Sequence, residues 1–433
     1  MSFIGAKHTV NSFISFSTIQ NVKNLNKYTV LDLIRFTPGG ISRVEIAHRI
    51  NLSRAAVTSI VNDLLTTGLV REAESRNVHS GRPPIVLEVN GERGYVVGLD
   101  FGATHLNLLV ADISSRILEE VEFAIDIQDG PEACLAEADV HMRELLAKAG
   151  IGFNDVLAFG VDVPGPIVTE AGMVVAPPIM PGWDRFPIRD TLEKKWDRPV
   201  SINNDAEMGV LGEWASGAGR GERDLVFIKI GTGIGAGLLI DGQIYRGVTG
   251  SAGEIGHLTI DENGPLCACG NYGCLEAIAG GRAIAQQARE AVQKGQRTHL
   301  SNIQPVESIT ARDVGAAARR GDLLSQQILT RAGTHIGIAI ASLVNMFNPG
   351  VIIIGGGVAQ NGDIILEPIR QAVQRRSLPA ATRIVRITTS MLGRRSSSMG
   401  AVIQAITIAL HQVADRKEVI TAVKTPKKSL ALN

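Results

Sequence analysis

The amino-acid sequence predicts an α/β protein with a small, mostly helical head and a larger body of two similar halves. The length of 433 residues suggests two or three domains. The 47 glycines, with 45% hydrophobic but only 4% aromatic residues, favour strands joined by tight turns around aliphatic cores. From Tyr95 onward, an apolar strand, a glycine turn and a second strand occur twice, about 130 residues apart. We place the head at 1–90, the halves at 91–222 and 223–415, and a frayed tail at 416–433.

The head is predicted to be a winged helix-turn-helix domain. Apolar side chains recur at helical spacing in three segments, 26–36, 41–50 and 54–70. Ser42 and Glu45 have the spacing of a capping box at the start of the second helix, and Gly68 ends the third. The segments LVREAE and IVLEVN then read as two strands, and SRNVHSGRPP between them reads as the wing.

The third helix and the wing carry side chains suited to DNA. Small hydroxyls and an arginine lie near the start of the helix and off its apolar face, as a major-groove reader requires. An arginine between glycine and proline in the wing is placed to enter a minor groove. The predicted DNA-binding residues are Ser53, Arg54, Thr58, Ser59 and Arg82. The alternatives are a three-helix dimerisation arm and a head that binds another protein.

Charge and hydropathy restrict the class of protein. The formal net charge is zero, but residues 1–90 hold ten Lys/Arg against six Asp/Glu, which weakly favours nucleic acid at this end. We expect no signal peptide, because no long apolar segment follows a basic start. We expect no membrane span either, because no run of about 18 apolar residues occurs. A cytoplasmic location is therefore expected.

Both strand pairs of the body have the form of phosphate-binding hairpins. The segments 95–112 and 225–242 each place glycines and a threonine in the turn, where backbone N–H groups can approach a phosphate. With NPGVIIIGGGVA (348–359), they predict a nucleotide cleft between the halves. The candidate nucleotide-binding residues are Asp100, Gly102, Thr104, Thr232, Gly233, Gly355 and Gly356. Taken singly, each hairpin could need its glycines for geometry alone.

The segment INNDAEMGVLGEW (202–214) marks the end of a strand and the start of a helix. At this junction the carboxylate of Asp205 could accept a proton from a sugar hydroxyl while Asn204 orients its neighbour. The alternative is a simple helix N-cap, which Asn and Asp both favour.

Three of the four cysteines lie within eight residues, beginning ten residues after His257. Cys267, Cys269 and Cys274 form with His257 a Cys₃His set, the usual composition of a tetrahedral structural zinc site. A bound Zn²⁺ would stabilise a loop that has little hydrophobic core of its own. A redox cysteine pair is the alternative.

The motif GEIGH followed by CACGNYGCLE resembles the signature of the ROK family (repressors, open reading frames and kinases), and the resemblance covers nearly the whole chain. It implies an actin-like, two-lobed sugar-kinase fold. It implies that sugar hydroxyls are contacted by Asn204, Asp205, Glu254, His257 and Glu276, with Asp205 in the catalytic-base position. Kinase members lack a DNA-binding head, whereas members with a winged helix-turn-helix, such as the xylose and N-acetylglucosamine repressors, are transcription regulators.

The resemblance therefore implies a sugar-responsive repressor that binds operator DNA as a homodimer or homotetramer. An ATP-dependent hexose kinase with a regulatory head is the alternative. Kinase members typically have D-x-G-G-T-K in the first hairpin, where this chain has Ala103 and His105 in place of the second glycine and the lysine. This departure argues against ATP and Mg²⁺ as cofactors and against more than weak kinase activity, although Asp205 and GTGIGAG are intact.

Overall fold

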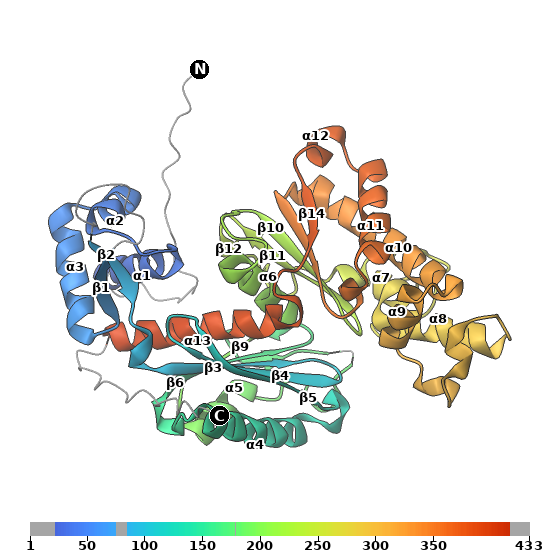
Figure 1. Ribbon diagram of the computed structural model, residues 1–433, viewed down its shortest axis with the longest axis horizontal. Helices are drawn as coiled ribbons and strands as arrows, with labels where there is room; N and C mark the ends of the chain where they lie inside the picture. Colours follow the sequence, from blue (N-terminus) through green and yellow to red (C-terminus); the bar gives the residue numbers. More distant parts are fainter. Residues whose placement is uncertain (1–21, 75–84, 178, 416–433) are drawn as a thin grey trace, which may run out of the picture.

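The structure is a computed structural model that describes residues 22–74, 85–177 and 179–415. A head and two sheet-based lobes follow one another along the chain (Figure 1). The head consists of α1 (Val22–Phe36), α2 (Arg43–Ile50), α3 (Arg54–Thr67) and the antiparallel strands β1 (Val70–Glu74) and β2 (Ile85–Val89). The helices and strands predicted for the head are thus present. The predicted wing loop, with Arg82, lies outside the described residues.

Local sequence signals set the ends of the head helices. The side chains of Ser42 and Glu45 form the predicted capping box at the start of α2. Gly68 ends α3 with φ at +73°, a left-handed conformation that glycine adopts without a steric cost. The apolar face of α3, including Val57 and Leu64, is fully buried in a core shared with α1.

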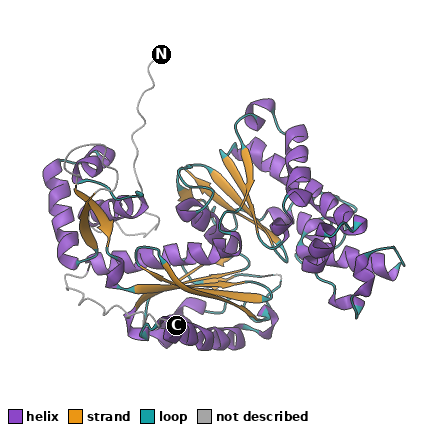
Figure 2. Cartoon of the chain, viewed as in Figure 1, coloured by secondary structure: helices purple, strands orange, loops and turns teal. Residues whose placement is uncertain are grey.

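Each lobe contains a five-stranded sheet, and the two sheets have the same topology (Figure 2). The strand order is β5-β4-β3-β6-β9 in the first sheet and β12-β11-β10-β13-β14 in the second. In each sheet, three consecutive strands are antiparallel and the other two are parallel to the central one. The first sheet comprises β3 (Tyr95–Phe101), β4 (His105–Asp112), β5 (Ile117–Ala124), β6 (Val156–Val163) and β9 (Val200–Asn204). The second comprises β10 (Leu225–Ile230), β11 (Ile234–Ile240), β12 (Gln243–Ile244), β13 (Val351–Gly355) and β14 (Arg386–Thr389). The predicted internal repeat is therefore present.

Helices cover both faces of each sheet. On the outer face of the first sheet lie α4 (Pro131–Ala149) and α5 (Ile188–Trp196), beside a small hairpin of β7 (Ile167–Val168) and β8 (Met173–Val174). The outer helices of the second lobe are α7 (Leu275–Ala279), α8 (Gly281–Gln293), α9 (Ala311–Arg319), α10 (Leu323–Phe347), α11 (Asp363–Arg376) and α12 (Pro379–Thr382). Between the sheets lie α6 (Asp205–Ser216) and α13 (Ser396–Asp415), packed against each other.

The last helix, α13, joins the head to the first lobe. It packs on β3 and β6, and its apolar residues share one core with α1 and α3. The approach is close: a Cβ added at Gly160 would overlap the carbonyl of Ala401, and one at Gly400 would overlap the carbonyl of Met208. We assigned this segment by sequence to the second half, 223–415, whereas it packs on the first sheet. The order of segments along the chain therefore does not by itself tell which sheet the last helix packs on.

The segment Gly393–Ala414 is, within the described part of the chain, the one helix long and apolar enough to cross a membrane. Its apolar composition is explained by burial, because 89% of its apolar window lies inside the protein.

Candidate functional site

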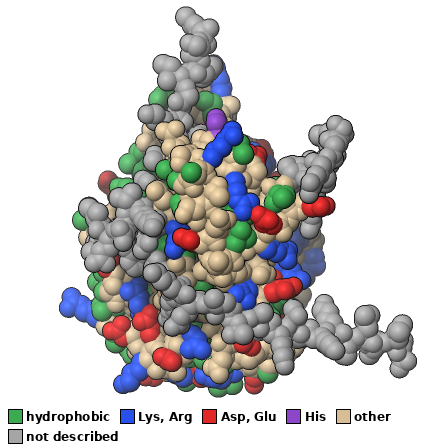
Figure 3. All heavy atoms as spheres, turned by 90° about the vertical axis from the view of Figure 1, so that its left-hand side faces the viewer, with side chains coloured by type: hydrophobic (Ala, Val, Ile, Leu, Met, Phe, Trp, Pro, Cys, Tyr) green, Lys and Arg blue, Asp and Glu red, His purple; other side chains and the backbone are tan. Residues whose placement is uncertain are grey.

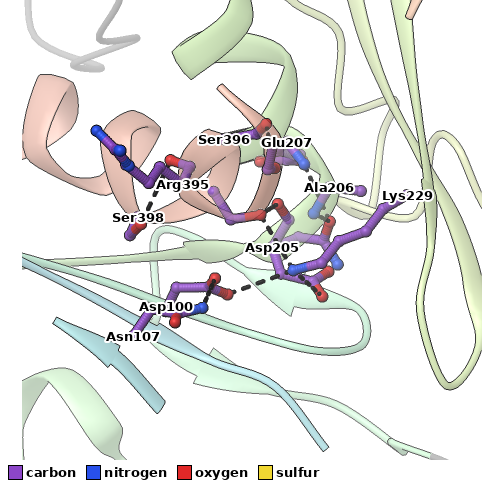
Figure 4. A network of polar contacts seen from close by, with 12 residues as sticks. Asp100, Asn107, Asp205, Ala206, Glu207, Lys229, Arg395, Ser396 and Ser398 are labelled. Atoms are coloured by element: carbon purple, nitrogen blue, oxygen red, sulfur yellow. Dashed lines mark hydrogen bonds and ion pairs between the residues drawn. The ribbon is translucent and has the colours of Figure 1, made fainter. Parts of the chain in front are cut away.

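A buried ion-pair network lies where the two lobes meet (Figure 4). The ammonium of Lys229, at the end of β10, is 3.3 Å from Asp100 Oδ1 on β3 and 3.0 Å from Asp205 Oδ2 at the start of α6. It also donates a hydrogen bond of 3.0 Å to Ser397 Oγ at the start of α13. Four segments that are distant in sequence thus meet at one lysine.

The charges in this network depend on one another. Burial alone would raise the pKa of Asp100, but the Lys229 ammonium, together with hydrogen bonds from neighbouring side chains, holds that pKa below its usual value. Asp162, which is paired with Asp100 in the parallel register of β6 and β3, behaves in the opposite way. Burial and the neighbouring Asp100 raise the pKa of Asp162 well above its usual value. Burial lowers the pKa of Lys229, yet Asp100 and Asp205 reverse this and raise it, so the ammonium stays charged.

The side chains of Asn204 and Asp205 face different groups. Asn204 is the N-cap of α6, because its Oδ1 accepts hydrogen bonds from the backbone N–H of Ala206 and of Glu207. Its Nδ2 donates to the carbonyl of Gly165 at 2.9 Å. The capping alternative therefore describes Asn204, whose amide retains one N–H for other contacts. Asp205, the first residue of the helix, points instead to Lys229 (Figure 4).

Further acidic side chains surround Asp205. Burial raises the pKa of Glu254 to about 7, and the charges of Asp205, Glu276 and Glu207 add to this effect. Glu276 Oε2 accepts a hydrogen bond of 3.0 Å from the backbone N–H of Ile234 on β11. The predicted residues Asp205, Glu254 and Glu276 are thus close enough to influence one another, and together they offer carboxylate acceptors for hydroxyl groups.

The predicted metal ligands come together in one cluster. One ligand atom from each of His257, Cys267, Cys269 and Cys274 lies within 4.8 Å of the others. The Sγ atoms of Cys269 and Cys274 are 3.7 Å apart, as are Cys267 Sγ and His257 Nδ1. This set could hold a metal ion. Cys134 lies elsewhere, buried in α4.

His257 connects this cluster to the acidic residues. Its Nδ1 faces Cys267, while its Nε2 is 3.9 Å from Glu254 Oε2. One imidazole ring can therefore serve as a metal ligand on one side and contact a bound molecule on the other.

The predicted phosphate hairpins make close contacts within the chain. In the first, Gly102 N–H donates to the carbonyl of His105 at 2.7 Å, and the His105 imidazole lies against the Cα of Gly102. Thr104 lies in the same turn. A Cβ at this glycine would overlap the ring. The open glycine face that a phosphate would need is therefore covered.

The second hairpin and the glycines after β13 are also packed by the chain. The carbonyl of Thr232 accepts a hydrogen bond from Arg282 N–H, and the carboxylate of Glu276 lies against Gly233. Gly355 lies against the ring of Phe227, and Gly356, with φ at +87°, lies against the backbone of Ile230. These glycines are needed for packing within the chain. That they also contact a nucleotide stays a prediction.

The predicted DNA-binding side chains of the described head are exposed. Ser53 is the N-cap of α3, and Arg54, Thr58 and Ser59 are exposed on the helix. Figure 3, which turns the side carrying the head toward the viewer, shows Lys and Arg side chains on this face together with Asp, Glu and hydrophobic ones.

Sequence reasoning missed Lys229 and Asp162. A signal for Lys229 was present, because a lysine interrupts the apolar strand LVFIKI. Its partner Asp100 lies 129 residues away and could not be paired with it from spacing alone.

Comparisons with known proteins agree with this architecture. A family model described as ROK family matches residues 96–408. The xylose repressor of Caldicellulosiruptor bescii is 31% identical, over 89% of this chain and 96% of its own length. Among solved structures, a ROK family transcriptional regulator homologous to Escherichia coli Mlc matches with a TM-score of 0.76 and 29% identity, covering 91% of this chain and 98% of its own. A ROK glucokinase from Streptomyces griseus, in complex with glucose and AMPPNP, matches at 0.64 and 30% identity, covering 72% and 99%. This chain belongs to the ROK family.

Proposed function

We propose that this chain is a sugar-responsive transcriptional repressor. The observation that carries the proposal is a helix-turn-helix head that shares one hydrophobic core, through α13, with a ROK body. The relatives that match along nearly their whole length support it, since the Caldicellulosiruptor bescii protein is named a xylose repressor. The protein would act in the cytoplasm on genes of carbohydrate uptake or catabolism.

DNA recognition is assigned to the head. Two copies of α3 in a homodimer, or in a homotetramer of such dimers, would read operator half-sites spaced by one helical turn or a multiple of it. Arg54, Thr58 and Ser59 would contact bases or phosphates, Ser53 would fix the start of the helix, and Arg82 would enter the minor groove.

Sugar recognition is assigned to the acidic residues beside α6. Asp205, Glu254 and Glu276 offer carboxylate oxygens that can accept hydrogen bonds from sugar hydroxyls, and His257 offers an imidazole nitrogen. Asn204 would act chiefly by holding the start of α6 in position. Sugar binding would favour one arrangement of the lobes, and α13 would transmit it to the head.

The metal that we propose for the Cys₃His cluster is zinc. With Zn–S bonds of about 2.3 Å, two sulfurs of a tetrahedral site lie about 3.8 Å apart. The 3.7 Å between the Sγ atoms of Cys269 and Cys274 fits this edge. All four positions are supplied by the protein, which favours a structural role, and the ion would fix the loop that carries His257.

The second candidate function is a hexose kinase. Asp205 and the glucokinase-like body favour it. The network around Lys229 and the His105 ring over Gly102 do not fit Mg²⁺–ATP, and the head has no counterpart in a match that covers 72% of this chain.

Two measurements on the zinc-loaded protein test the proposal. A thermal-shift screen against glucose, xylose and N-acetylglucosamine, with and without ATP–Mg²⁺, should give a shift with a sugar that ATP does not change. The protein should then bind an operator fragment, selected from genomic DNA, with lower affinity when that sugar is added. ADP release coupled to sugar, with no selected DNA, would favour the kinase instead.

A further inference from the structure

Lys229 is an unusual residue for its place in β10. Leu225 and Phe227, on the same face of the strand, are buried in an apolar cluster against α6. Its neighbours across the sheet are Gly235 on β11 and Gly355 on β13, so neither adjacent strand places a side chain directly opposite the lysine. A buried charge destabilises a fold unless it is paired, and here the pairing spans both lobes.

The carboxyl groups around Lys229 are of the kind that bind a divalent cation. Asp100 and Asp205 pair with the ammonium, and the nearby Asp162 also influences its ionisation. Carboxylate oxygens are preferred ligands of Mg²⁺, which binds in proteins through one or two carboxylates together with substrate phosphates. The ammonium supplies the positive charge that such a cation would supply.

The same ammonium restricts the chemistry of Asp205. Its Oδ2 already accepts a charge-assisted hydrogen bond of 3.0 Å from Lys229, while Oδ1 can still accept one from a hydroxyl. A carboxylate paired in this way remains a hydrogen-bond acceptor through its second oxygen.

We propose that Lys229 is the specificity-determining residue that makes this cleft a receptor for sugar alone, by occupying the place of a nucleotide-bound divalent cation. The Lys229 ammonium neutralises Asp100 and Asp205 and repels a second cation at the same position. The carboxylate of Asp205 is thereby kept as a hydrogen-bond acceptor for sugar. This inference rests on the proposed sugar site and deepens it, since it states why sugar binding needs no nucleotide.

The test is a manganese titration without sugar or DNA. Free Mn²⁺ is measured by electron paramagnetic resonance, with and without AMPPNP, on the zinc-loaded wild-type protein and on Lys229→Met, which keeps the length of the side chain without its charge. The wild-type protein should bind no Mn²⁺ in the cleft. Lys229→Met should gain one Mn²⁺ site with at least tenfold higher affinity, and Lys229→Met/Asp100→Asn should lose that site again.

Lys195→Met is the matched control, because Lys195 pairs with Asp139 on the first lobe at 3.2 Å, away from the cleft. It should behave as the wild type does. Binding of Mn²⁺–AMPPNP to the wild-type protein, tightened by sugar, would overturn the proposal without any variant. So would a Lys229→Met protein with a normal melting transition and no new Mn²⁺ site. Operator binding that no sugar changes would instead refute the proposed function and leave the manganese result standing.

Discussion

Arg35 of α1 is the residue at which we expect a substitution to uncouple the head from the body. Its guanidinium donates hydrogen bonds of 2.7 Å to Thr407 Oγ1 and to the carbonyl of Ile403, both on α13. Burial, offset in part by Asp32, lowers the pKa of Arg35 to about 10, so the group stays charged at neutral pH. The bonds are therefore charge-assisted.

The expected magnitude follows from these two bonds. Arg35→Met keeps an apolar stem but removes both bonds, each worth about 1.5–3 kcal/mol when the donor is charged. Relief from burying the guanidinium offsets part of that loss. The contact between the head and α13 should therefore be weaker by about 2 kcal/mol. This is comparable with the coupling free energy of ~1–3 kcal/mol by which a ligand at one site usually changes the affinity of another site. The sugar should then lose most of its effect on DNA binding.

The assay is fluorescence anisotropy of the selected operator at fixed salt, with and without the sugar found in the thermal screen. In Arg35→Met, the ratio of the two affinities should approach one, while sugar affinity stays unchanged. Arg198→Met is the matched control, because the Arg198 guanidinium also donates hydrogen bonds, but to groups within the first lobe, the backbone carbonyls of Val156, Asp197 and Asn154. A folded Arg35→Met protein with the full wild-type sugar response would refute this reasoning.

Three further predictions concern the metal, the DNA and the pH. Cys269→Ser should remove the zinc seen by elemental analysis and weaken the sugar response, whereas Cys134→Ser should keep both; zinc retained at one per chain in Cys269→Ser would contradict the assignment. Arg54→Ala should weaken operator binding by about 1–3 kcal/mol at fixed salt, and unchanged affinity would exclude α3 as the reading helix. Burial raises the pKa of Asp32 from 3.8 to about 6, so the folded head holds this proton more tightly and loses stability as pH rises from about 4 through 6. The free energy of unfolding in urea should fall over this pH range by up to about 3 kcal/mol less in Asp32→Asn than in the wild type. Parallel pH profiles of the two proteins would contradict this role of Asp32.

The features that sequence predicted well depend on short-range spacing. The Cys₃His set spans eighteen residues, and its four ligand atoms do meet. The capping box of Ser42 and Glu45 and the glycine that ends α3 are signals within one turn of a helix. Such patterns constrain the local backbone directly, so few alternatives remain.

The features that sequence missed depend on long-range packing. The pairing of Lys229 with Asp100 requires both sheets to be in position. The apolar pattern of α13 predicts a buried helix but does not indicate that it packs on the first sheet. Asn204 shows a third kind of limit. Its residue type suited both a cap and a ligand, and only the observed bonds to Ala206 and Glu207 identify it as the cap.

The position of α13 suggests how the cleft and the head act on each other. Ser397 at its start contacts Lys229 and donates to the carbonyl of Asp205, whereas Ile403 and Thr407, further along, hold Arg35 of the head. Backbone contacts at glycines along the helix leave no room for it to slide on the first sheet or on α6. We therefore infer that a change at Asp205 reaches the head by a rigid movement of α13 with these neighbours, and that bending within the helix contributes little.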